Sequence, residues 1–416
     1  MKASSALAPA LRDAAHLVAR VASGRSLADE RLHGAVLDLT HGSLRRYGRV
    51  QSIVRALSTR EQQDPLVEAL LWCSIYALES GRYAEYTVVD QAVRACTLLE
   101  KWPAKSFVNA LLRRFLRERH SIEARIGADE EARFQHPRWW IEALRESHPG
   151  EWESALAQGN AMPPMSLRVN RRRVSRDQYH AQLAAAGLAA RPVGTDGVLL
   201  EQPLPVERVP GFADGQVSVQ DAGAQRAAHC LDLHAGQRVL DACAAPGGKS
   251  AHILELAEVA LTAVDADAAR VSRIEVNLRR LGLPAAAVRT ADAAHLKDWW
   301  DGVPFDRILA DVPCTASGVA RRHPDLKWLR RDGDREQFAQ RQATMLDALW
   351  RALAPGGKLL YVTCSVFLQE NDAVVDAFVA RAAGAARLAL PDGGPAGLLP
   401  SAEHDGFFFA LIQRQA

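Results

Sequence analysis

The stretch Asp241-Ala-Cys-Ala-Ala-Pro-Gly-Gly-Lys-Ser250 decides the fold of the C-terminal half of this 416-residue chain. It follows a strand predicted at residues 238–243 and opens a helix predicted at residues 248–257. Small residues let a ligand approach the backbone, and free N–H groups at a helix start favour polar or negative groups. The spacing is neither Gly-x-Gly-x-x-Gly nor that of a P-loop, which weakens the interpretation as a dinucleotide site.

From about residue 231 onward, strands and helices alternate as a doubly wound sheet requires. The predicted strands lie at residues 238–243, 261–265, 287–290, 306–311 and 358–363. The predicted helices lie at residues 248–257, 268–281, 335–354 and 371–383. The run at residues 407–412 predicts a last, antiparallel strand. We therefore expect a C-terminal Rossmann-like α/β domain over residues 231–416.

Two acidic residues follow the second and third predicted strands, at Asp265 and Asp292. An acid at the first of these places can accept hydrogen bonds from ribose hydroxyls, and one at the second can contact an adenine amino group. The competing interpretation is that both residues cap short helices. Together the three loops describe an adenosine pocket without a diphosphate cradle. S-adenosylmethionine fits it, because this ligand carries an amino-acid tail and a sulfonium instead of phosphates.

Two cysteines stand where predicted strands end, in Asp311-Val-Pro-Cys314 and in Thr363-Cys-Ser365. A thiolate that adds to C6 of cytosine, with a proton at N3, makes C5 able to take a methyl cation. A base must then remove the C5 proton so that the thiol can leave. Asp311, Cys314 and Cys364 are the candidates for this chemistry.

The other cysteines have a simpler interpretation, because small buried cysteines are common core residues. We assign Cys73, Cys96 and Cys230 to the core, and we expect Cys243 to line the cofactor loop through its backbone. The six cysteines show no Cys-x-x-Cys pair and no zinc-like spacing, so no metal is predicted. Reduced thiols indicate a cytoplasmic protein.

Basic residues gather in two segments, although the net charge of the chain is only +2. Residues 167–176 hold five arginines, and residues 321–331 hold five Lys or Arg residues around Trp328. Such clusters can contact phosphates, and a solvated basic face is the alternative. The candidate RNA contacts are Arg168, Arg171, Arg172, Arg173, Arg321, Arg322 and Lys327. For Trp328 we prefer core filling to base stacking.

The remaining chain divides into two further parts. Residues 1–145 show helical spacing throughout and predict an all-α bundle, with a capping box at Thr87-x-x-Asp90. Residues 146–230 predict a linker and a small α+β subdomain, with strands at 166–170 and 197–201 and a helix at 176–186. No apolar run reaches membrane length, and residues 1–5 are not followed by the apolar core of a signal peptide.

At these residues the chain resembles the cytosine-5 RNA methyltransferases of the Sun (NSUN-like) family over nearly its whole length. The most specific string spans residues 311–331, and residues 216–222, 240–249 and 363–365 agree with it. Val312 departs slightly, because Ala or Pro is frequent there. The helical first 145 residues resemble the NusB-like RNA-binding domain of this family.

The resemblance implies that the chain methylates C5 of cytosine in 16S rRNA with S-adenosylmethionine, through a covalent bond from cysteine to C6. It makes Cys364 the nucleophile and Cys314 the residue that assists release, and it places Asp311 near cytosine N3. The implied cofactor contacts are Cys243, Ala244, Ala245, Pro246, Gly247, Gly248, Lys249, Asp265, Asp292 and Asp311. The implied partner is 16S rRNA or an assembling small-subunit particle. The sequence does not determine the oligomeric state, and a monomer is expected.

Three alternatives stay open from the sequence. The same chemistry on tRNA or at another rRNA site is the nearest of them. A non-catalytic RNA-binding scaffold is disfavoured by the set of Cys364, Cys314 and Asp311. A small-molecule methyltransferase would leave the helical domain and the arginine clusters without a purpose.

Overall fold

The computed structural model describes residues 7–28, 30–58, 64–283 and 287–416. Its contacts divide the chain into unit 1, Met1–Ala161 with Ala320–Asp332, and unit 2, Met162–Val319 with Gly333–Ala416. These borders differ from the predicted ones. Residue 145 lies inside helix α8 (Arg138–Ser147), and a short piece of the C-terminal half belongs to unit 1. The N-terminal residues 1–5 lie outside the described part of the chain.

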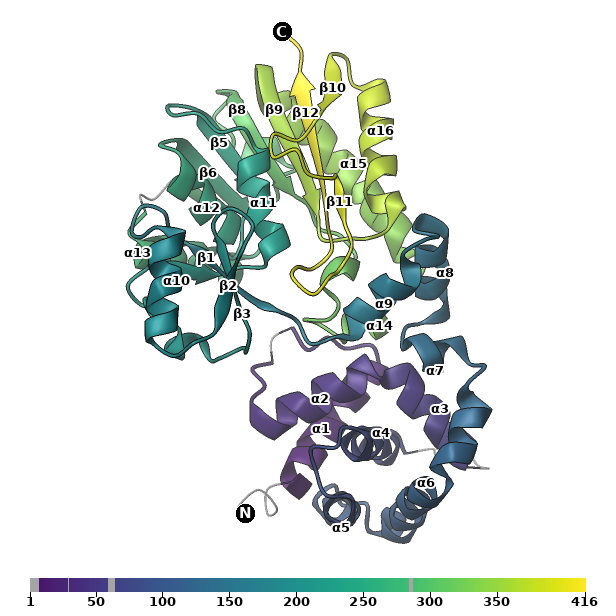
Figure 1. Cartoon of the computed structure of the whole chain (residues 1–416). Helices are drawn as coiled ribbons and strands as arrows, with labels where there is room; N and C mark the ends of the chain where they lie inside the picture. The colour runs from purple at the N-terminus through teal and green to yellow at the C-terminus, as the bar shows by residue number, and fades with distance from the viewer. Residues whose placement is uncertain (1–6, 29, 59–63, 284–286) are drawn as a thin grey trace. The chain divides into compact units, whose positions relative to one another are not determined.

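Unit 1 is helical, as predicted, with helix α4 (Pro65–Glu79) at its centre. The helix starts where the Asp64 carboxylate accepts hydrogen bonds from the backbone N–H groups of Leu66 and Val67. It packs against several other helices of the unit, and Figure 1 shows them around it. The other α-helices of unit 1 are α1 (Leu7–Ala22), α2 (Gly34–Arg45), α3 (Tyr47–Leu57), α5 (Glu85–Leu98), α6 (Lys105–Ile126), α7 (Glu130–Phe134), α8, α9 (Trp152–Asn160) and α14 (Leu326–Leu329).

Helix α14 lies in the segment Ala320–Asp332, which packs within unit 1. Indole Nε1 of Trp328 donates a hydrogen bond to the carbonyl oxygen of Leu44 at 2.7 Å. The Trp328 ring meets the ring of Tyr47 edge to face, with centroids 4.8 Å apart. The prediction that Trp328 fills a core is confirmed.

Among all described helices, none is both long and apolar enough to cross a membrane.

Unit 2 begins with a small antiparallel sheet in the order β2-β3-β1-β4. Its strands are β1 (Met165–Val169), β2 (Ala190–Val193), β3 (Gly197–Leu200) and β4 (Val217–Val219). Helix α10 (Arg176–Ala185) packs on this sheet through the buried side chains of Tyr179 and Leu183. Ser175 and Gln178 form a capping box at the start of α10. The small α+β subdomain is thereby confirmed.

The large sheet of unit 2 has the order β10-β12-β9-β8-β5-β6-β7, and β11 pairs with β12. Strands β5 to β9 run parallel, and β12 runs antiparallel to β9, as predicted. The strands are β5 (Arg238–Ala242), β6 (Ala260–Asp265), β7 (Ala287–Thr290), β8 (Phe305–Asp311), β9 (Leu353–Thr363), β10 (Ala385–Leu388), β11 (Gly397–Leu398) and β12 (Phe407–Arg414). The predicted Rossmann-like α/β architecture is confirmed.

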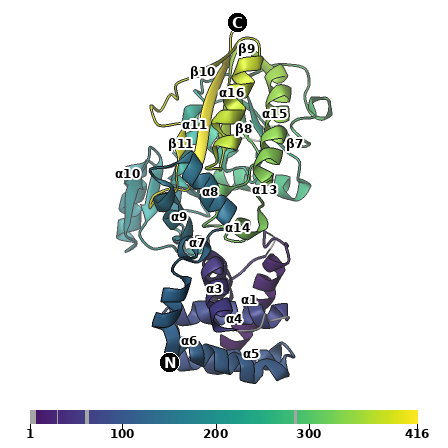
Figure 2. The same ribbon diagram turned by 90° about the vertical axis from the view of Figure 1, so that its right-hand side faces the viewer.

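Helices cover both faces of the large sheet, because successive side chains of each strand point to opposite faces. In β9, Leu360 and Val362 join one apolar cluster, whereas Leu359 and Tyr361 join another. Helices α11 (Ala222–Cys230), α12 (Gly248–Leu256) and α13 (Ala268–Leu281) pack in the first cluster. Helices α15 (Asp334–Ala352) and α16 (Asp372–Arg381) pack in the second, side by side in Figures 1 and 2.

Candidate active site

The carboxyl ends of the parallel strands gather the predicted site residues at one edge of the large sheet. Strand β5 pairs with β6 on one side and with β8 on the other, and β8 pairs with β9. Asp265 and Asp311 are the last residues of β6 and β8, and Cys243 and Cys364 directly follow β5 and β9. In open parallel sheets, ligands bind outside this edge.

A pocket of about 230 Å³ lies at this edge and brings together three of the predicted cofactor residues, Cys243, Asp265 and Asp292. The sequence did not identify the rest of its lining, which includes Ala293, Pro313, Gln342 and Met345. Gln342 and Met345 come from helix α15, about a hundred residues after Cys243, so no local sequence motif predicts that they line this pocket.

Asp265 supports the loop at residues 243–249 and does not cap a helix. Its Oδ2 accepts a hydrogen bond from the backbone N–H of Ala245 at 3.0 Å. The cap of helix α13 is Asp267, which accepts from Ala269 and Arg270. Asp292 is exposed and accepts from the backbone N–H of Ala294 in a tight turn.

The loop at residues 243–249 brings its backbone close to the pocket and to helix α13. Cys243 and Gly247 have positive φ values of 68° and 94°. A Cβ on Gly247 would lie 3.0 Å from Cα of Ile274, so only glycine fits there without a shift of α13. Burial, and then nearby carboxylates, raise the pKa of Cys243. This thiol is therefore neutral, and it donates to Met345 Sδ at 3.8 Å.

The thiols of Cys314 and Cys364 lie side by side, with their sulfur atoms 3.4 Å apart. Cys364 is partly exposed, whereas Cys314 is buried. A hydrogen bond with Cys364, followed by burial, raises the pKa of Cys314 well above its ordinary value. Cys314 is thus a protonated thiol beside the more accessible sulfur of Cys364.

An ion pair completes the arrangement, because Nζ of Lys249 donates to Oδ2 of Asp311 at 2.6 Å. Burial lowers the pKa of Lys249, but the charge and the hydrogen bond of Asp311 outweigh it, and the net pKa is raised. The site therefore holds an ammonium group fixed by Asp311. The sequence placed Lys249 only among the cofactor contacts.

Glu370 is a further residue of the site that the sequence did not reveal. It is fully buried, and its carboxylate accepts hydrogen bonds from Thr315 and Ser365, which directly follow the two cysteines. Glu370 lies two residues before helix α16, outside any sequence motif, so the sequence alone does not predict its role.

The prediction of RNA contacts is wrong for three basic side chains, because they are buried. Arg168 is 0% exposed and forms a bidentate ion pair with Glu255 at 2.9 Å. Lys327 is 0% exposed, and its ammonium group donates to Arg45 O, Gln135 O and Asn160 Oδ1 within unit 1. Burial lowers the pKa of Lys327. Arg321 is 1% exposed.

The other predicted RNA contacts remain available to solvent. Arg171, Arg172 and Arg173 are exposed in the turn after β1, and Arg322 is partly exposed. Their role toward RNA stays a prediction.

The parallel sheet with its antiparallel strand β12, and a carboxyl edge that holds both a pocket and two thiols, define a Rossmann-like class I methyltransferase. Family models match three stretches of the chain. They are the NusB family at residues 11–117, a ferredoxin-like domain of RsmF/B-like methyltransferases at 136–207, and 16S rRNA methyltransferase RsmB/F at 228–413.

Whole-chain relatives agree with these matches. Ribosomal RNA small subunit methyltransferase B of Pseudomonas syringae pv. tomato is 41% identical over 99% of this chain and 96% of its own length. The protein of that name from Pseudomonas putida is 43% identical over 99% and 97%. A methyltransferase homolog from Pyrococcus horikoshii has a TM-score of 0.61 at 26% identity, over 69% of this chain and 98% of that structure. The chain belongs to the ribosomal RNA small subunit methyltransferase B family.

Proposed function

We propose that this protein methylates C5 of a cytosine in 16S rRNA with S-adenosylmethionine, through a transient bond between Cys364 and C6 of the base. The observation that carries the proposal is the pair of thiols 3.4 Å apart at the edge that also holds the Lys249–Asp311 ion pair. The relatives are named for ribosomal RNA of the small subunit, which supports this class of substrate.

The pocket at the sheet edge fits the cofactor in the chemistry of its donors. Asp265 and Asp292 offer carboxylates for ribose hydroxyls and for the adenine amino group, and Ala293, Pro313 and Met345 offer apolar surface. Backbone N–H groups at the start of helix α12 suit the carboxylate of the amino-acid tail. When bound, S-adenosylmethionine supplies a methyl cation from its sulfonium.

Cys364 begins the reaction, because this residue is partly exposed whereas Cys314 is buried. The Cys364 thiolate forms a bond to C6, and the electrons of the C5–C6 double bond move into the ring as N3 takes a proton from the Lys249–Asp311 pair. Asp311 holds the Lys249 ammonium group in place at the sheet edge that also carries Cys364. Asp311 lies between this ammonium group and N3 in the proposal, and it passes a proton from Lys249 to N3, which leaves Lys249 as a neutral amine.

Cys314 serves the last step, in which the bond between Cys364 and C6 breaks. After C5 has taken the methyl group, a base removes the C5 proton, the C5–C6 double bond re-forms as sulfur leaves C6 as a thiolate, and N3 returns its proton to the Lys249–Asp311 pair. A protonated Cys314, 3.4 Å away, stabilises that thiolate by donating a hydrogen bond to it. The two cysteines therefore have different tasks.

The RNA is proposed to contact the exposed arginines of the turn after β1 and the NusB-like helical domain. Arg171, Arg172 and Arg173 are the side chains that this proposal commits to, with Arg322 as a fourth. The target base must leave its stack to reach the thiols, which an unpaired loop nucleotide does at modest cost. The same proposal includes action in the cytoplasm on 16S rRNA or an assembling small-subunit particle.

Bisulfite mapping of RNA from cells with and without the gene tests this proposal. One 5-methylcytosine in 16S rRNA is expected to disappear without the gene and to return with the wild-type gene, but not with Cys364→Ala. Loss of the mark from tRNA alone would move the same chemistry to another RNA. An unchanged map would refute the methyltransferase assignment.

A further inference from the structure

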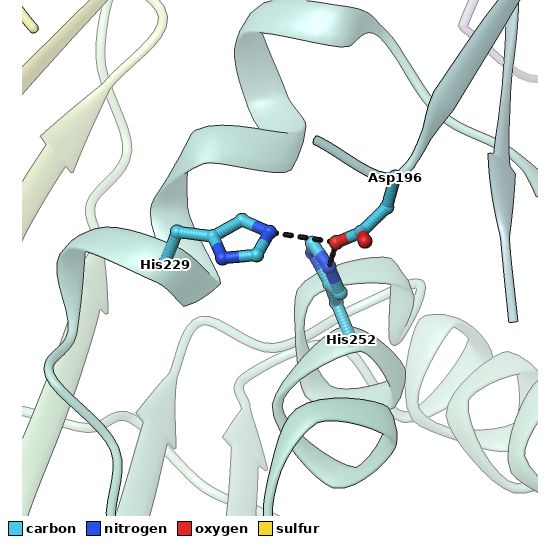
Figure 3. A group of neighbouring side chains, drawn as sticks. All are labelled: Asp196, His229 and His252. Carbon is cyan, nitrogen blue, oxygen red and sulfur yellow. Dashed lines mark hydrogen bonds and ion pairs between the residues drawn. The ribbon is translucent and has the colours of Figure 1, made fainter. Parts of the chain in front are cut away.

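Asp196, His229 and His252 form a cluster in unit 2 that the methyl-transfer chemistry does not use. Asp196 lies in the turn between β2 and β3, His229 near the end of α11, and His252 in α12 (Figure 3). Nε2 of His229 lies 2.6 Å from Oδ2 of Asp196, and Nε2 of His252 lies 3.0 Å from the same oxygen. Three separate elements thus aim three potential metal ligands at one point.

The spacing of these atoms is close to that of a tetrahedral transition-metal site. The three ligand atoms all lie within 4.8 Å of one another. Zinc binds imidazole nitrogen and carboxylate oxygen at about 2.0–2.2 Å, which separates neighbouring tetrahedral ligands by roughly 3.3 Å. Small movements of the three side chains would convert the observed arrangement into that of a tetrahedral metal site.

The cluster is shielded on one side and accessible on the other. Asp196 is 2% exposed and His252 is 1% exposed, whereas His229 is partly exposed. Asp196 and His229 also line a pocket of about 370 Å³, which offers an entry path and room for a fourth ligand such as water.

The arginines near the cluster do not occupy Oδ2 of Asp196, the oxygen that faces the two histidines. Arg171 lies 3.4 Å from Oδ1 of Asp196, the oxygen that the histidines do not contact, and so orients this carboxylate from outside. The guanidinium group of Arg168 is paired with Glu255 instead of Asp196.

We propose that Asp196, His229 and His252 bind one divalent transition-metal ion of the zinc type, which ties the β2–β3 turn to helices α11 and α12. The ion is structural. The competing arrangement is free of metal, with both Nε2 atoms carrying hydrogen and donating to Asp196. The same distances fit both arrangements, so metal binding itself must be measured.

A zinc titration of the full-length, tag-free protein against a chromophoric chelator tests the proposal. It uses a Cys314→Ser/Cys364→Ser background, so that the active-site thiols do not bind the metal. One equivalent of Zn²⁺ is expected in this background, and Co²⁺ is expected to give the visible bands of a tetrahedral site. Both signals should vanish in His229→Ala and in the shape-conserving Asp196→Asn.

The matched control is His180→Gln, because Nε2 of His180 contacts the carbonyl oxygen of Ala190 in the same small sheet, outside the cluster. This variant should keep the zinc equivalent. A chelator should lower the melting temperature of the background protein and leave that of His229→Ala unchanged. Equal zinc binding with and without His229 would overturn the proposal in favour of the metal-free arrangement.

A second inference rests on a different observation, the hydrogen bonds of Glu370. Its Oε1 accepts from the backbone N–H of Thr315 at 2.7 Å. Its Oε2 accepts from the hydroxyl groups of Thr315 at 2.5 Å and of Ser365 at 2.6 Å. Thr315 follows Cys314 and Ser365 follows Cys364, so one buried carboxylate joins both cysteine loops.

We infer that Glu370 is a positioning residue that sets the distance between the sulfur atoms of Cys314 and Cys364. The inference gives Glu370 a part in the proposed function, because the release step needs the two sulfurs in contact. Gln342, which lines the pocket at the sheet edge, extends the same network, since its Nε2 lies 3.4 Å from Oε1 of Glu370 and donates to the carbonyl oxygen of Pro313 at 2.9 Å.

The spacing is measured directly by oxidising the two thiols to a disulfide with diamide, without RNA or cofactor. Glu370→Ala is expected to slow this cross-link on the order of tenfold, because the loops lose their shared anchor. Glu370→Gln keeps the shape and one acceptor oxygen, so it should restore most of the rate. Mass spectrometry of the cysteine-containing peptides gives the rate.

Glu255→Gln is the matched control, because it removes another buried carboxylate, one that pairs with Arg168. Glu255→Gln should lower stability without changing the cross-link rate. An unchanged rate in Glu370→Ala would overturn the positioning role. Since no methylation is measured, that result would leave the proposed function of the cysteines standing.

Discussion

Cys364 and Arg168 lie in the same unit, but their side chains differ in exposure and in the number of bonds they make within the protein. Cys364 is partly exposed, and its sulfur lies beside the neutral thiol of Cys314. Arg168 is fully buried, and its guanidinium group donates to Glu255, Gln220 and the carbonyl oxygen of Gly248. A group whose bonding capacity is filled inside the protein holds the fold together, and one left accessible can do chemistry.

Removing the Cys364 sulfur has the largest expected effect. Cys364→Ala should lower methyl transfer roughly a thousandfold or more, because the proposed bond to C6 cannot form without this sulfur. Transfer of a labelled methyl group to RNA measures the loss. Cys230→Ala removes a buried cysteine from the apolar cluster on one sheet face and should keep its activity. Comparable losses in both variants would contradict the distinction between the two cysteines.

Breaking the Arg168 ion pair should act on stability. Arg168→Met leaves Glu255 buried without its partner, which should lower the free energy of unfolding by about 3–5 kcal/mol. Urea titration measures the change. The matched control is Arg172→Met at an exposed position, which should change stability by less than about 0.5 kcal/mol. An equal free energy of unfolding in the two variants would show that the ion pair does not contribute to stability.

Removing Cys314 separates bond formation from release. Cys314→Ala should still form the bond to RNA, but turnover should fall on the order of a hundredfold because the leaving thiolate loses its hydrogen-bond donor. A denaturation-resistant protein–RNA band should accumulate on a gel. Normal methylation with no such band would assign Cys314 to structure alone.

The exposed arginines should give the smallest effect. Replacing Arg171, Arg172 and Arg173 by Gln should weaken RNA binding and flatten its salt dependence, by about 0.7–0.9 in slope for each phosphate that is no longer neutralised. Filter binding at several salt concentrations gives the slope. An unchanged slope would show that these arginines, like Arg168, do not meet RNA.

Much of unit 2 follows from local sequence patterns. Helix α13 (Ala268–Leu281) and strand β7 (Ala287–Thr290) have the predicted bounds. Strand-end positions placed Cys243, Asp265, Asp311 and Cys364 at one edge, because parallel strands share the direction in which they end.

Most of the failures share one cause, which is contact between residues far apart in the chain. Arg168 and Lys327 were predicted as surface charges because a sequence does not show Glu255 or the carbonyl group of Gln135 beside them. The segment Ala320–Asp332 joins unit 1 through such contacts as well. One error was local: the capping box at Thr87 is wrong, because helix α5 starts at Glu85 after Ala84.

The central claim is tested most directly by trapping the covalent adduct. RNA that carries 5-fluorocytosine should hold the enzyme after methyl transfer, because fluorine at C5 cannot leave as a proton does. Mass spectrometry of the digested complex should find the nucleotide on the peptide that contains Cys364. A nucleotide on the peptide that contains Cys314 would contradict the account. So would the absence of any adduct with a fluorinated RNA whose unfluorinated form the enzyme methylates.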